Sequence, residues 1–130
     1  MPPEQSIPAG FTRSRRTSRP LDLVGPLFEH DSESDYRVGV RVDDRHTHAK
    51  GFCHGALLAL LADVHLGRHL GRLCAMSTEP RLALVTVSLT LNYLAPARRG
   101  EWLDAQGQVD RVGRMLAHSN AWFWLMGGQR

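Results

Sequence analysis

The sequence predicts an α+β fold in which a curved antiparallel sheet wraps around one long central helix. The first observation is an apolar run from Ala56 to Val64 that only Asp63 interrupts, because a helix that is apolar all round is expected to be buried. The second is a series of segments with strand-like alternation on both sides of that run. The third is their order, two strands, the helix and three strands, since a lone apolar helix is buried only when a sheet curves around it.

Before the helix, Leu27 to His30 is predicted to open a short strand. Tyr36 to Asp43 alternates apolar and polar side chains, as a half-buried strand does. The helix is predicted from about His54 to Leu70, which corresponds to a length of roughly 25 Å. Gly71 is predicted to cap its C-terminus.

Three strands are predicted after the helix, over Leu82 to Leu94, Trp102 to Arg111 and Met115 to Met126. Pro96 ends the first of them, and Val112–Gly113 is predicted to form the tight turn between the last two. These three strands can therefore pair as an antiparallel meander.

The length of 130 residues suits one domain, and we predict a flexible basic arm over residues 1–20 and a single domain over residues 21–130. The arm carries four of the seven prolines and the basic segment from Arg13 to Arg19. No apolar run is long enough to cross a membrane and the start lacks a secretory pattern, so a cytoplasmic protein with no membrane partner is predicted. The net charge of +3 accompanies no recognition motif, so no nucleic-acid partner is predicted.

The spacing of polar residues along the helix limits how they can act. Asp63 follows His54 by nine residues, which is two and a half helical turns, so the two side chains point to opposite sides. They are also about 13 Å apart along the axis. One helix cannot bring both to one reacting atom, whereas two copies related by a two-fold axis can. We therefore predict a homodimer with its sites between the subunits, alone or paired into a tetramer.

The start of the helix has chemistry of its own. Its first backbone N–H groups have no partner within the helix and lie at the positive end of the helix dipole. Gly55 lets a ligand approach this backbone closely, which suits a polarised carbonyl or an oxyanion. A carboxylate such as Asp63, arriving from the partner subunit, would supply a base or a nucleophile. Together these groups predict acyl transfer or hydrolysis.

A longer pattern, within residues 25–126, carries a family resemblance. Its parts are His48, Gly51, His54, Gly55, Asp63, Gly67 and the strand end Asn92-Tyr93-Leu94-Ala95-Pro96-Ala97. The pattern resembles the hotdog-fold thioesterases and, within them, the phenylacetate-degradation (PaaI-like) and 4-hydroxybenzoyl-CoA thioesterase group. The resemblance implies the hotdog fold and hydrolysis of an acyl-CoA, with a small, medium or aromatic acyl group, to the free acid and CoA.

The resemblance also implies a role for each matching residue. Asp63 is expected to act as nucleophile or as general base on water, and the N–H of Gly55 to polarise the thioester carbonyl. His54 shapes that site, and Thr86 orients the water or the acid. The CoA phosphates are expected to be held by basic residues at turns, namely Arg98, Arg99, Arg111 and Arg114. No cofactor is implied, because CoA is part of the substrate.

Two residues depart from the family pattern. His48 replaces an Asn, which offers both a donor and an acceptor, whereas one tautomer of histidine matches only one of these at a time. Ala56 replaces a second glycine, and its methyl group narrows the approach to the helix start. These departures leave open an alternative, a non-catalytic hotdog module that binds acyl-CoA as a sensor or carrier. The retained Asp63 favours the enzyme, because a binding module has no need of that acid.

A metal site is the remaining alternative. Two sets of histidines have ligand-like spacing, namely His46, His48 and His54 before the helix and His65 and His69 within it. Neither set has a convincing further partner, so no metal is predicted.

Overall fold

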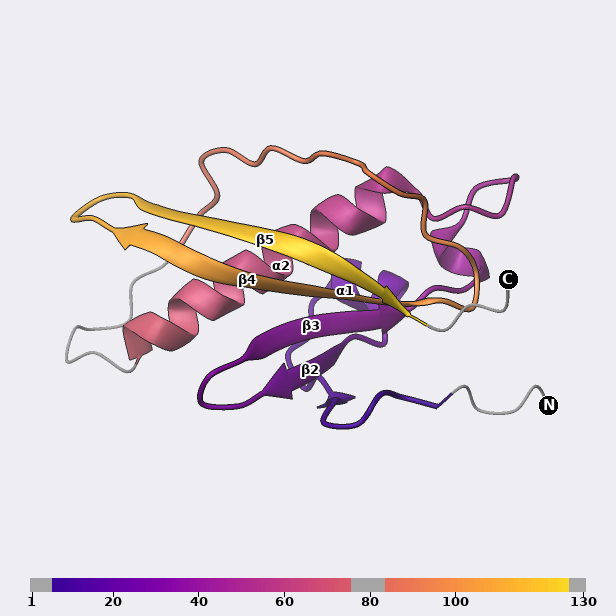
Figure 1. Cartoon of the computed structure of the whole chain (residues 1–130), viewed down its shortest axis with the longest axis horizontal. Coiled ribbons are helices and arrows are strands. Elements are labelled where there is room, and N and C mark those ends of the chain that lie inside the picture. The colour runs from indigo at the N-terminus through magenta and orange to yellow at the C-terminus, as the bar shows by residue number, and fades with distance from the viewer. Residues whose placement is uncertain (1–5, 76–83, 127–130) are drawn as a thin grey trace.

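The computed structural model describes residues 6–75 and 84–126. Within these residues the strands form one antiparallel sheet in the order β1-β2-β3-β4-β5, and one long helix, α2, lies against it (Figure 1). The elements in chain order are β1 (Thr12–Arg13), α1 (Arg19–Val24), β2 (Phe28–Asp31), β3 (Tyr36–Arg41), the short 3-10 helix η1 (Asp44–His46), α2 (Gly55–Ala75), β4 (Trp102–Val112) and β5 (Ala117–Met126).

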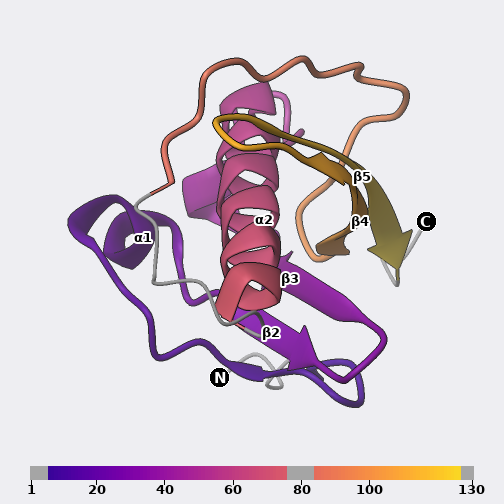
Figure 2. The ribbon, with the colours of Figure 1, turned by 90° about the vertical axis from the view of Figure 1, so that its left-hand side faces the viewer.

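The sheet curves around α2. Figure 2, in which α2 runs from top to bottom, shows β2 and β3 toward the lower end of the helix and β4 and β5 beside it. Every neighbouring pair of strands is antiparallel. The predicted α+β arrangement with one wrapped helix is confirmed, as are the predicted strands that correspond to β2, β3, β4 and β5. Gly71 does not end α2, which continues to Ala75, because packing of a long helix outweighs the weak helix preference of one glycine.

The hydrophobic core lies between one side of α2 and the inner face of the sheet. The helix contributes Leu57, Leu58 and Leu61, and the sheet contributes Val38, Val40, Leu103 and Ala105. Truncating a buried leucine to alanine costs about 2–5 kcal/mol, so these contacts are strong enough to fix α2 on the sheet.

The helix α2 is buried on one side only, which corrects the prediction of a helix buried all round. Ala56, Asp63 and Gly67 are exposed, whereas Leu61 and His65 are buried. The residues that reach the sheet recur every three or four positions along the helix, as expected for one buried side. The apolar flanks of Asp63 therefore do not bury it, because its position around the helix turns it away from the sheet.

Residues 84–94 form no strand, which corrects the prediction of a strand from Leu82 to Leu94; residues 82 and 83 lie outside the described part of the chain. Instead β5 ends the sheet on this side. Val85 and Val87 are 85% and 78% exposed. Alternation indicates which residues share a face, but a strand also needs a neighbouring strand to pair with. The local sequence pattern does not show whether such a neighbour is present.

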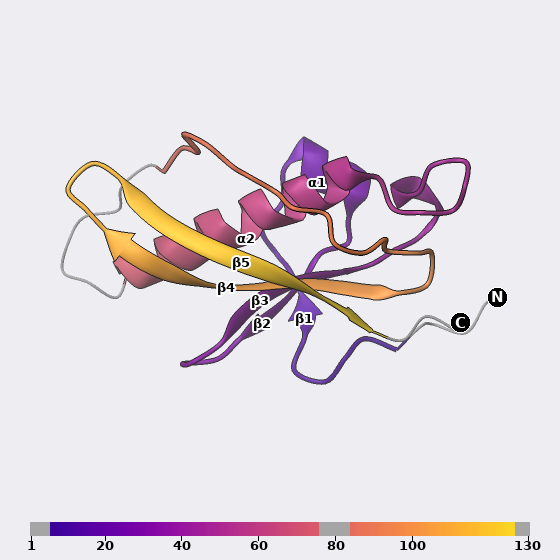
Figure 3. The same cartoon turned by 45° about the horizontal axis from the view of Figure 1, so that its top comes forward.

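This extended segment runs antiparallel to α2 along the side of the helix that the sheet leaves open (Figure 3). Thr86 bonds to Asp63 in the middle of the helix, and Tyr93 bonds to Gly55 at its start. The segment thus brings hydroxyl groups to two separate places on α2.

Part of the predicted arm packs on the outer face of the sheet, where β1 pairs with β2. Phe11 makes an edge contact with Trp102, with ring centroids 4.9 Å apart, and the Arg41 guanidinium lies 5.4 Å from the same indole ring. Gly39 leaves room for the indole, because a Cβ there would lie 2.2 Å from a ring carbon. Trp102 is therefore enclosed and only 1% exposed.

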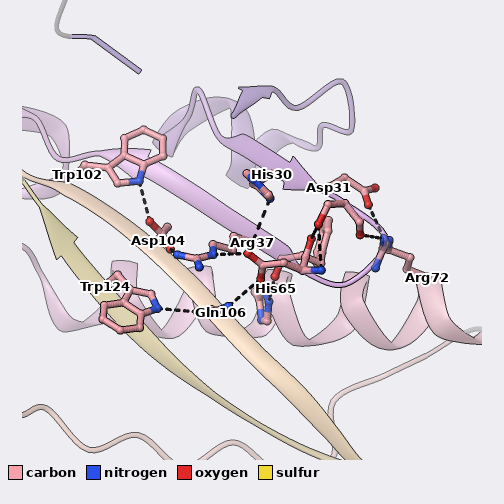
Figure 4. A network of polar contacts seen from close by, with 12 residues as sticks. His30, Asp31, Arg37, His65, Arg72, Trp102, Asp104, Gln106 and Trp124 are labelled. Atoms are coloured by element: carbon pink, nitrogen blue, oxygen red, sulfur yellow. Dashed lines mark hydrogen bonds and ion pairs between the residues drawn. The ribbon is translucent and has the colours of Figure 1, made fainter. Parts of the chain in front are cut away.

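A polar network continues from Trp102 along the sheet (Figure 4). The indole N–H of Trp102 donates to the buried carboxylate of Asp104 at 2.9 Å, and Arg37 lies 3.6 Å from the other carboxylate oxygen. Burial raises the pKa of Asp104, and the nearby Arg37 partly opposes that rise. Further hydrogen bonds extend the network through Asp35, Gln106 and Trp124. The network ties β3, β4 and β5 together.

Candidate active site

The loop that leads into α2 is anchored by His46. Its Nδ1 accepts a hydrogen bond from the N–H of Asp43 at 2.9 Å, and its Nε2 donates to the carbonyl of Val24 at 2.5 Å. Because both ring nitrogens are occupied and the side chain is buried, His46 is a structural residue and not a metal ligand. The N–H of His54 bonds to the carbonyl of His46 at 2.8 Å, which fixes where α2 begins.

His48 sits in a tight turn of the same loop. The N–H of Gly51 donates to the carbonyl of His48 at 2.8 Å, and the φ of +82° at Gly51 is one that favours glycine. The N–H of Lys50 donates to Nδ1 of His48 at 3.1 Å. In the neutral ring the proton is therefore on Nε2, which makes that nitrogen a hydrogen-bond donor. The exposed ring of His54 is its neighbour, with ring centroids 5.5 Å apart.

Tyr93 covers the start of α2. Its hydroxyl donates to the carbonyl of Gly55 at 2.9 Å, and a Cβ on Gly55 would lie 3.1 Å from atoms of the phenol ring. Only a residue without a side chain fits under the ring without displacing it. The first turn of α2, which is fully described, carries no acidic residue, so nothing there neutralises the positive end of the helix dipole.

A pocket of about 450 Å³ opens at this helix start. It is lined by His48, Phe52, Cys53, Gly55, Leu58 and residues 93–97. Burial raises the pKa of the Cys53 thiol to about 11, so the group is a neutral thiol near pH 7 and not a thiolate nucleophile. The volume and the mainly apolar lining suit a compact apolar group attached to a carbonyl.

Asp63 lies in the middle of α2 on its exposed side, where its carboxylate accepts a hydrogen bond from the hydroxyl of Thr86. Neither residue lines the pocket. One chain therefore carries two separate groups of candidate site residues. We name them the helix-start group (His48, His54 and Gly55) and the carboxylate group (Asp63 and Thr86); about 13 Å of helix separates them.

The four predicted arginines fall in two places. Arg98 lies at the pocket, with its guanidinium 5.2 Å from the ring of Phe52, and Arg99 forms an ion pair with Asp44 at 2.8 Å. Arg111 and Arg114 are exposed around the β4–β5 hairpin, at the end of the sheet away from the start of α2 (Figure 1). Only Arg98 is therefore beside the pocket of its own chain.

Eight pocket residues were not predicted as site residues from the sequence, namely Phe52, Cys53, Leu58 and residues 93–97. One signal was available for two of them. Phe52 and Cys53 are apolar residues in an otherwise polar loop, directly before the helix start. Tyr93 belongs to the strand-end pattern that carries the family resemblance, but alternation assigns it to the face of a strand and gives no sign that it lines a pocket.

The second histidine set also lacks the geometry of a metal site. His65 is fully buried, and its Nε2 bonds to the carbonyl of Tyr36 at 3.0 Å. Across residues 6–75 and 84–126, no group of three or more His, Cys, Asp or Glu side chains is placed to hold a metal ion. In the same residues, no helix has the length and apolar character needed to cross a membrane.

Comparison with solved structures identifies the fold. The structure of zebrafish thioesterase superfamily member 2 superposes with a TM-score of 0.63 at 23% identity, over 85% of this chain and 75% of that one. The mouse protein of the same name gives a TM-score of 0.59 at 23% identity, over 82% and 72% of the two chains. With the curved sheet and single helix, this likeness confirms the hotdog fold.

Sequence comparison identifies the family. A protein of Pseudomonas aeruginosa whose name proposes an esterase is 39% identical over 117 residues, which are 89% of this chain and 84% of that one. Human acyl-coenzyme A thioesterase 13 is 30% identical over 81 residues, or 62% of this chain, which spans about half (54%) of the human protein. The family description that matches residues 50–125 is the thioesterase superfamily. Because this match covers more than half of its 130 residues, the chain belongs to the thioesterase superfamily.

Proposed function

We propose that this protein hydrolyses the thioester of an acyl-CoA with a small, medium or aromatic acyl group, releasing the free acid and CoA. The observation that carries the proposal is the presence of two groups on α2. The helix-start group places backbone donors beside an apolar pocket, and the carboxylate group holds a carboxylate bonded to a hydroxyl. Membership of the thioesterase superfamily supports thioester hydrolysis in general. The name of the human relative, an acyl-coenzyme A thioesterase, supports CoA as the thiol.

In the proposed reaction the acyl group occupies the pocket, and its carbonyl oxygen accepts a hydrogen bond from the N–H of Gly55. The positive end of the helix dipole then stabilises the negative charge that develops on this oxygen. As a general base, Asp63 takes a proton from water, whose oxygen attacks the carbonyl carbon; the carbon–sulfur bond then breaks and the CoA thiolate takes up that proton. As a nucleophile, the carboxylate attacks the carbon itself, and breaking of the carbon–sulfur bond gives an acyl–aspartate anhydride and the CoA thiolate. Water then cleaves the anhydride, which releases the free acid, regenerates Asp63 and supplies the proton to the thiolate. Thr86, which donates to Asp63, orients the carboxylate.

The proposal needs two chains at each site. In one chain the helix-start group and the carboxylate group are on opposite sides of α2, so one substrate carbonyl cannot contact both. A homodimer in which the helix start of one chain faces the middle of the other would join them, with Asp63 supplied by the partner subunit. Pairing of two such dimers into a tetramer and a cytoplasmic location remain predictions.

His48 supports this enzyme over the sensor or carrier. Its neutral ring has Nδ1 occupied by the N–H of Lys50, so Nε2 carries a proton that can be donated in the pocket. This donor can replace the one that the family obtains from its Asn, which supports retained catalysis. The proposal also includes membership of the PaaI-like and 4-hydroxybenzoyl-CoA thioesterase group, which rests on the sequence pattern from His48 to Ala97.

The arginines are proposed to bind the phosphates of CoA from two positions. Arg98, beside the pocket mouth, would contact the CoA bound to its own chain, with Arg99 next to it in the turn. Arg111 and Arg114 are far from that mouth in their own chain, so they would reach a CoA bound mainly to the partner subunit. Each contact would be charge-assisted and bidentate where geometry allows.

Free thiol released from a panel of aromatic and aliphatic acyl-CoAs tests the proposed function. We expect turnover of at least one member, and calorimetry on the same panel should show which members bind. Binding of several members with thiol release from none would replace the enzyme with the sensor or carrier.

Hybrid dimers test the shared site. Asp63→Asn and His54→Ala proteins are each expected to have low activity, and mixing them after subunit exchange should restore part of it, because some hybrids hold one intact site. Exchange is followed with differently tagged chains. Complete exchange without any recovery of activity would show that each site is built within one chain.

A further inference from the structure

A second pocket, of about 340 Å³, lies between the N-terminal arm and the turn that follows α1. Figure 2 shows the arm and α1 together on one side of α2. The lining of this second pocket shares no residue with the lining of the pocket at the start of α2. It also lies outside residues 50–125, where the family description matches. Four arginines line it, namely Arg13, Arg15, Arg16 and Arg45.

The charges around this pocket are unbalanced. Arg13, Arg15 and Arg16 are exposed, and within the described residues no side-chain partner is found for their guanidinium groups. Asp22 is the one acidic residue among the described residues of the lining, and it already accepts a hydrogen bond from the hydroxyl of Thr17. An anion in the pocket could therefore bind several guanidinium groups without breaking side-chain interactions that they already make.

The backbone that carries these arginines is held in place. The N–H of Ser14 donates to the carbonyl of Leu27 at 2.8 Å. Arg68, which is paired with Glu29 at 3.0 Å, donates to the hydroxyl of Ser14 at 3.1 Å and to the carbonyl of Arg16 at 3.3 Å. A side chain of the central helix therefore fixes one wall of the pocket, which lowers the entropy lost when a ligand binds.

The opposite wall combines a cation with apolar surface. Arg45 donates to the carbonyl of Gly25 at 2.9 Å and forms an ion pair with Asp43 at 3.2 Å, and these contacts hold its guanidinium beside the turn after α1. Leu21, Pro26 and Leu27 contribute apolar lining. A ligand that suits both features carries a compact anionic group attached to a less polar body, and the volume is near the lower end for small-molecule sites.

From these contacts we propose that the arm, α1 and Arg45 form a second ligand site, which binds a phosphomonoester of about mononucleotide size. The planar guanidinium groups of arginine match phosphate oxygens in pairs, and they also stack on flat rings such as a nucleobase. The same chemistry has two sources, a free mononucleotide or the adenosine 3′-phosphate portion of CoA, and direct binding measurements can separate them.

Calorimetric titration of the full chain with AMP, inorganic phosphate, adenosine 3′,5′-bisphosphate and CoA tests this site. We expect AMP to bind with an affinity that falls as sodium chloride is added, since exposed charges are screened by salt. The double variant Arg15→Gln/Arg16→Gln should bind AMP about tenfold more weakly or worse. Displacement of AMP by CoA would identify the CoA nucleotide as the source, and AMP binding that CoA leaves unchanged would identify a free mononucleotide.

Arg19→Gln is the matched control, because Arg19 is an exposed arginine of the same basic segment that does not line the pocket. It should bind AMP like the unaltered protein, whereas Arg16→Gln alone should weaken binding. Thermal unfolding of each variant shows that the fold is intact. Absence of binding by every phosphate-bearing probe, or equal weakening by Arg19→Gln and Arg16→Gln, would overturn the proposal. Because binding is measured directly, the outcome does not depend on whether the protein hydrolyses thioesters.

Discussion

Asp63 and His65 are two positions apart on the same helix, yet their side chains lie in opposite environments. Asp63 is exposed and accepts a hydrogen bond from a hydroxyl of the segment that runs along α2. His65 is fully buried, stacks on Tyr36 with ring centroids 5.7 Å apart, and bonds to the Tyr36 carbonyl. Burial lowers the pKa of His65 to about 4, so the ring is neutral at pH 7.

The difference shows that the burial of a polar residue in a helix depends more on its angular position around the helix axis than on the residues next to it in the sequence. Two positions correspond to about 200° of rotation, so the two side chains point in nearly opposite directions. Asp63 is directed to solvent, a substrate or a second chain, and His65 is directed to the sheet. We therefore expect changes at Asp63 to alter catalysis and changes at His65 to alter stability.

The largest expected effect follows from Asp63→Asn. Loss of a general base or nucleophile should reduce the rate of thioester hydrolysis roughly 10²–10⁴-fold, while the free energy of unfolding changes by less than about 0.5 kcal/mol, because the side chain is exposed. Thiol release and urea unfolding measure the two quantities. Glu33→Gln, at an exposed acid in the turn between β2 and β3, is the control and should change neither. Near-normal turnover of Asp63→Asn would remove the carboxylate from the mechanism.

The second effect is a pH dependence of stability that belongs to His65. Its folded pKa of about 4 is below the usual 6.5, so the stabilisation is complete above pH 6.5 and is lost as the pH falls through about 4. The loss over this range should be about 3 kcal/mol.

In His65→Gln this pH dependence should shrink, since a glutamine amide can still donate to the Tyr36 carbonyl but does not titrate. Urea unfolding between pH 4 and 7 provides the measurement. His69 and Asp35 also act electrostatically on the His65 ring and remain unchanged in the variant. His118→Gln, at an exposed position on β5, should keep the pH dependence of the unaltered protein; an equal loss in both variants would contradict the assignment to His65.

Gly55→Ala extends the comparison to the start of α2. The added methyl group would press on the ring of Tyr93, so the ring or the helix start must move, and the hydrolysis rate should fall by up to about 100-fold. Gly71→Ala is a matched control on the same helix, because a Cβ there meets open space. It should keep full activity and gain up to about 1 kcal/mol of stability from better helix propensity. Equal rates for the two variants would show that the helix start is not a site of close approach.

The smallest expected effect follows from Thr86→Val, which removes the hydroxyl that bonds to Asp63. The carboxylate stays but is less well oriented, so the rate should fall by about tenfold. Thr90→Val removes an exposed hydroxyl from the same segment and should leave the rate unchanged. If both variants lose activity equally, Thr86 acts through the fold of the segment and not through Asp63.

Much of this fold was predictable because its signals are local. Alternation identifies β3, and the apolar run identifies α2. The opposite directions of His54 and Asp63 also follow from the helical repeat alone. Two features were not predictable, because they depend on residues far apart in the chain. Residues 84–94 have the pattern of a strand but no strand beside them, and the contact of Tyr93 with Gly55 joins positions 38 residues apart.

The enclosure of Trp102 gives the protein an optical reporter of its own. Of its three tryptophans, Trp102 is covered by Phe11 from the N-terminal arm, whereas Trp122 and Trp124 are 40% and 48% exposed. Water that reaches the buried indole shifts its fluorescence to longer wavelength, while the two exposed indoles already emit from a partly aqueous environment. In a Trp122→Phe/Trp124→Phe background, the emission colour would therefore follow the docking of the arm alone, in real time and without an attached dye.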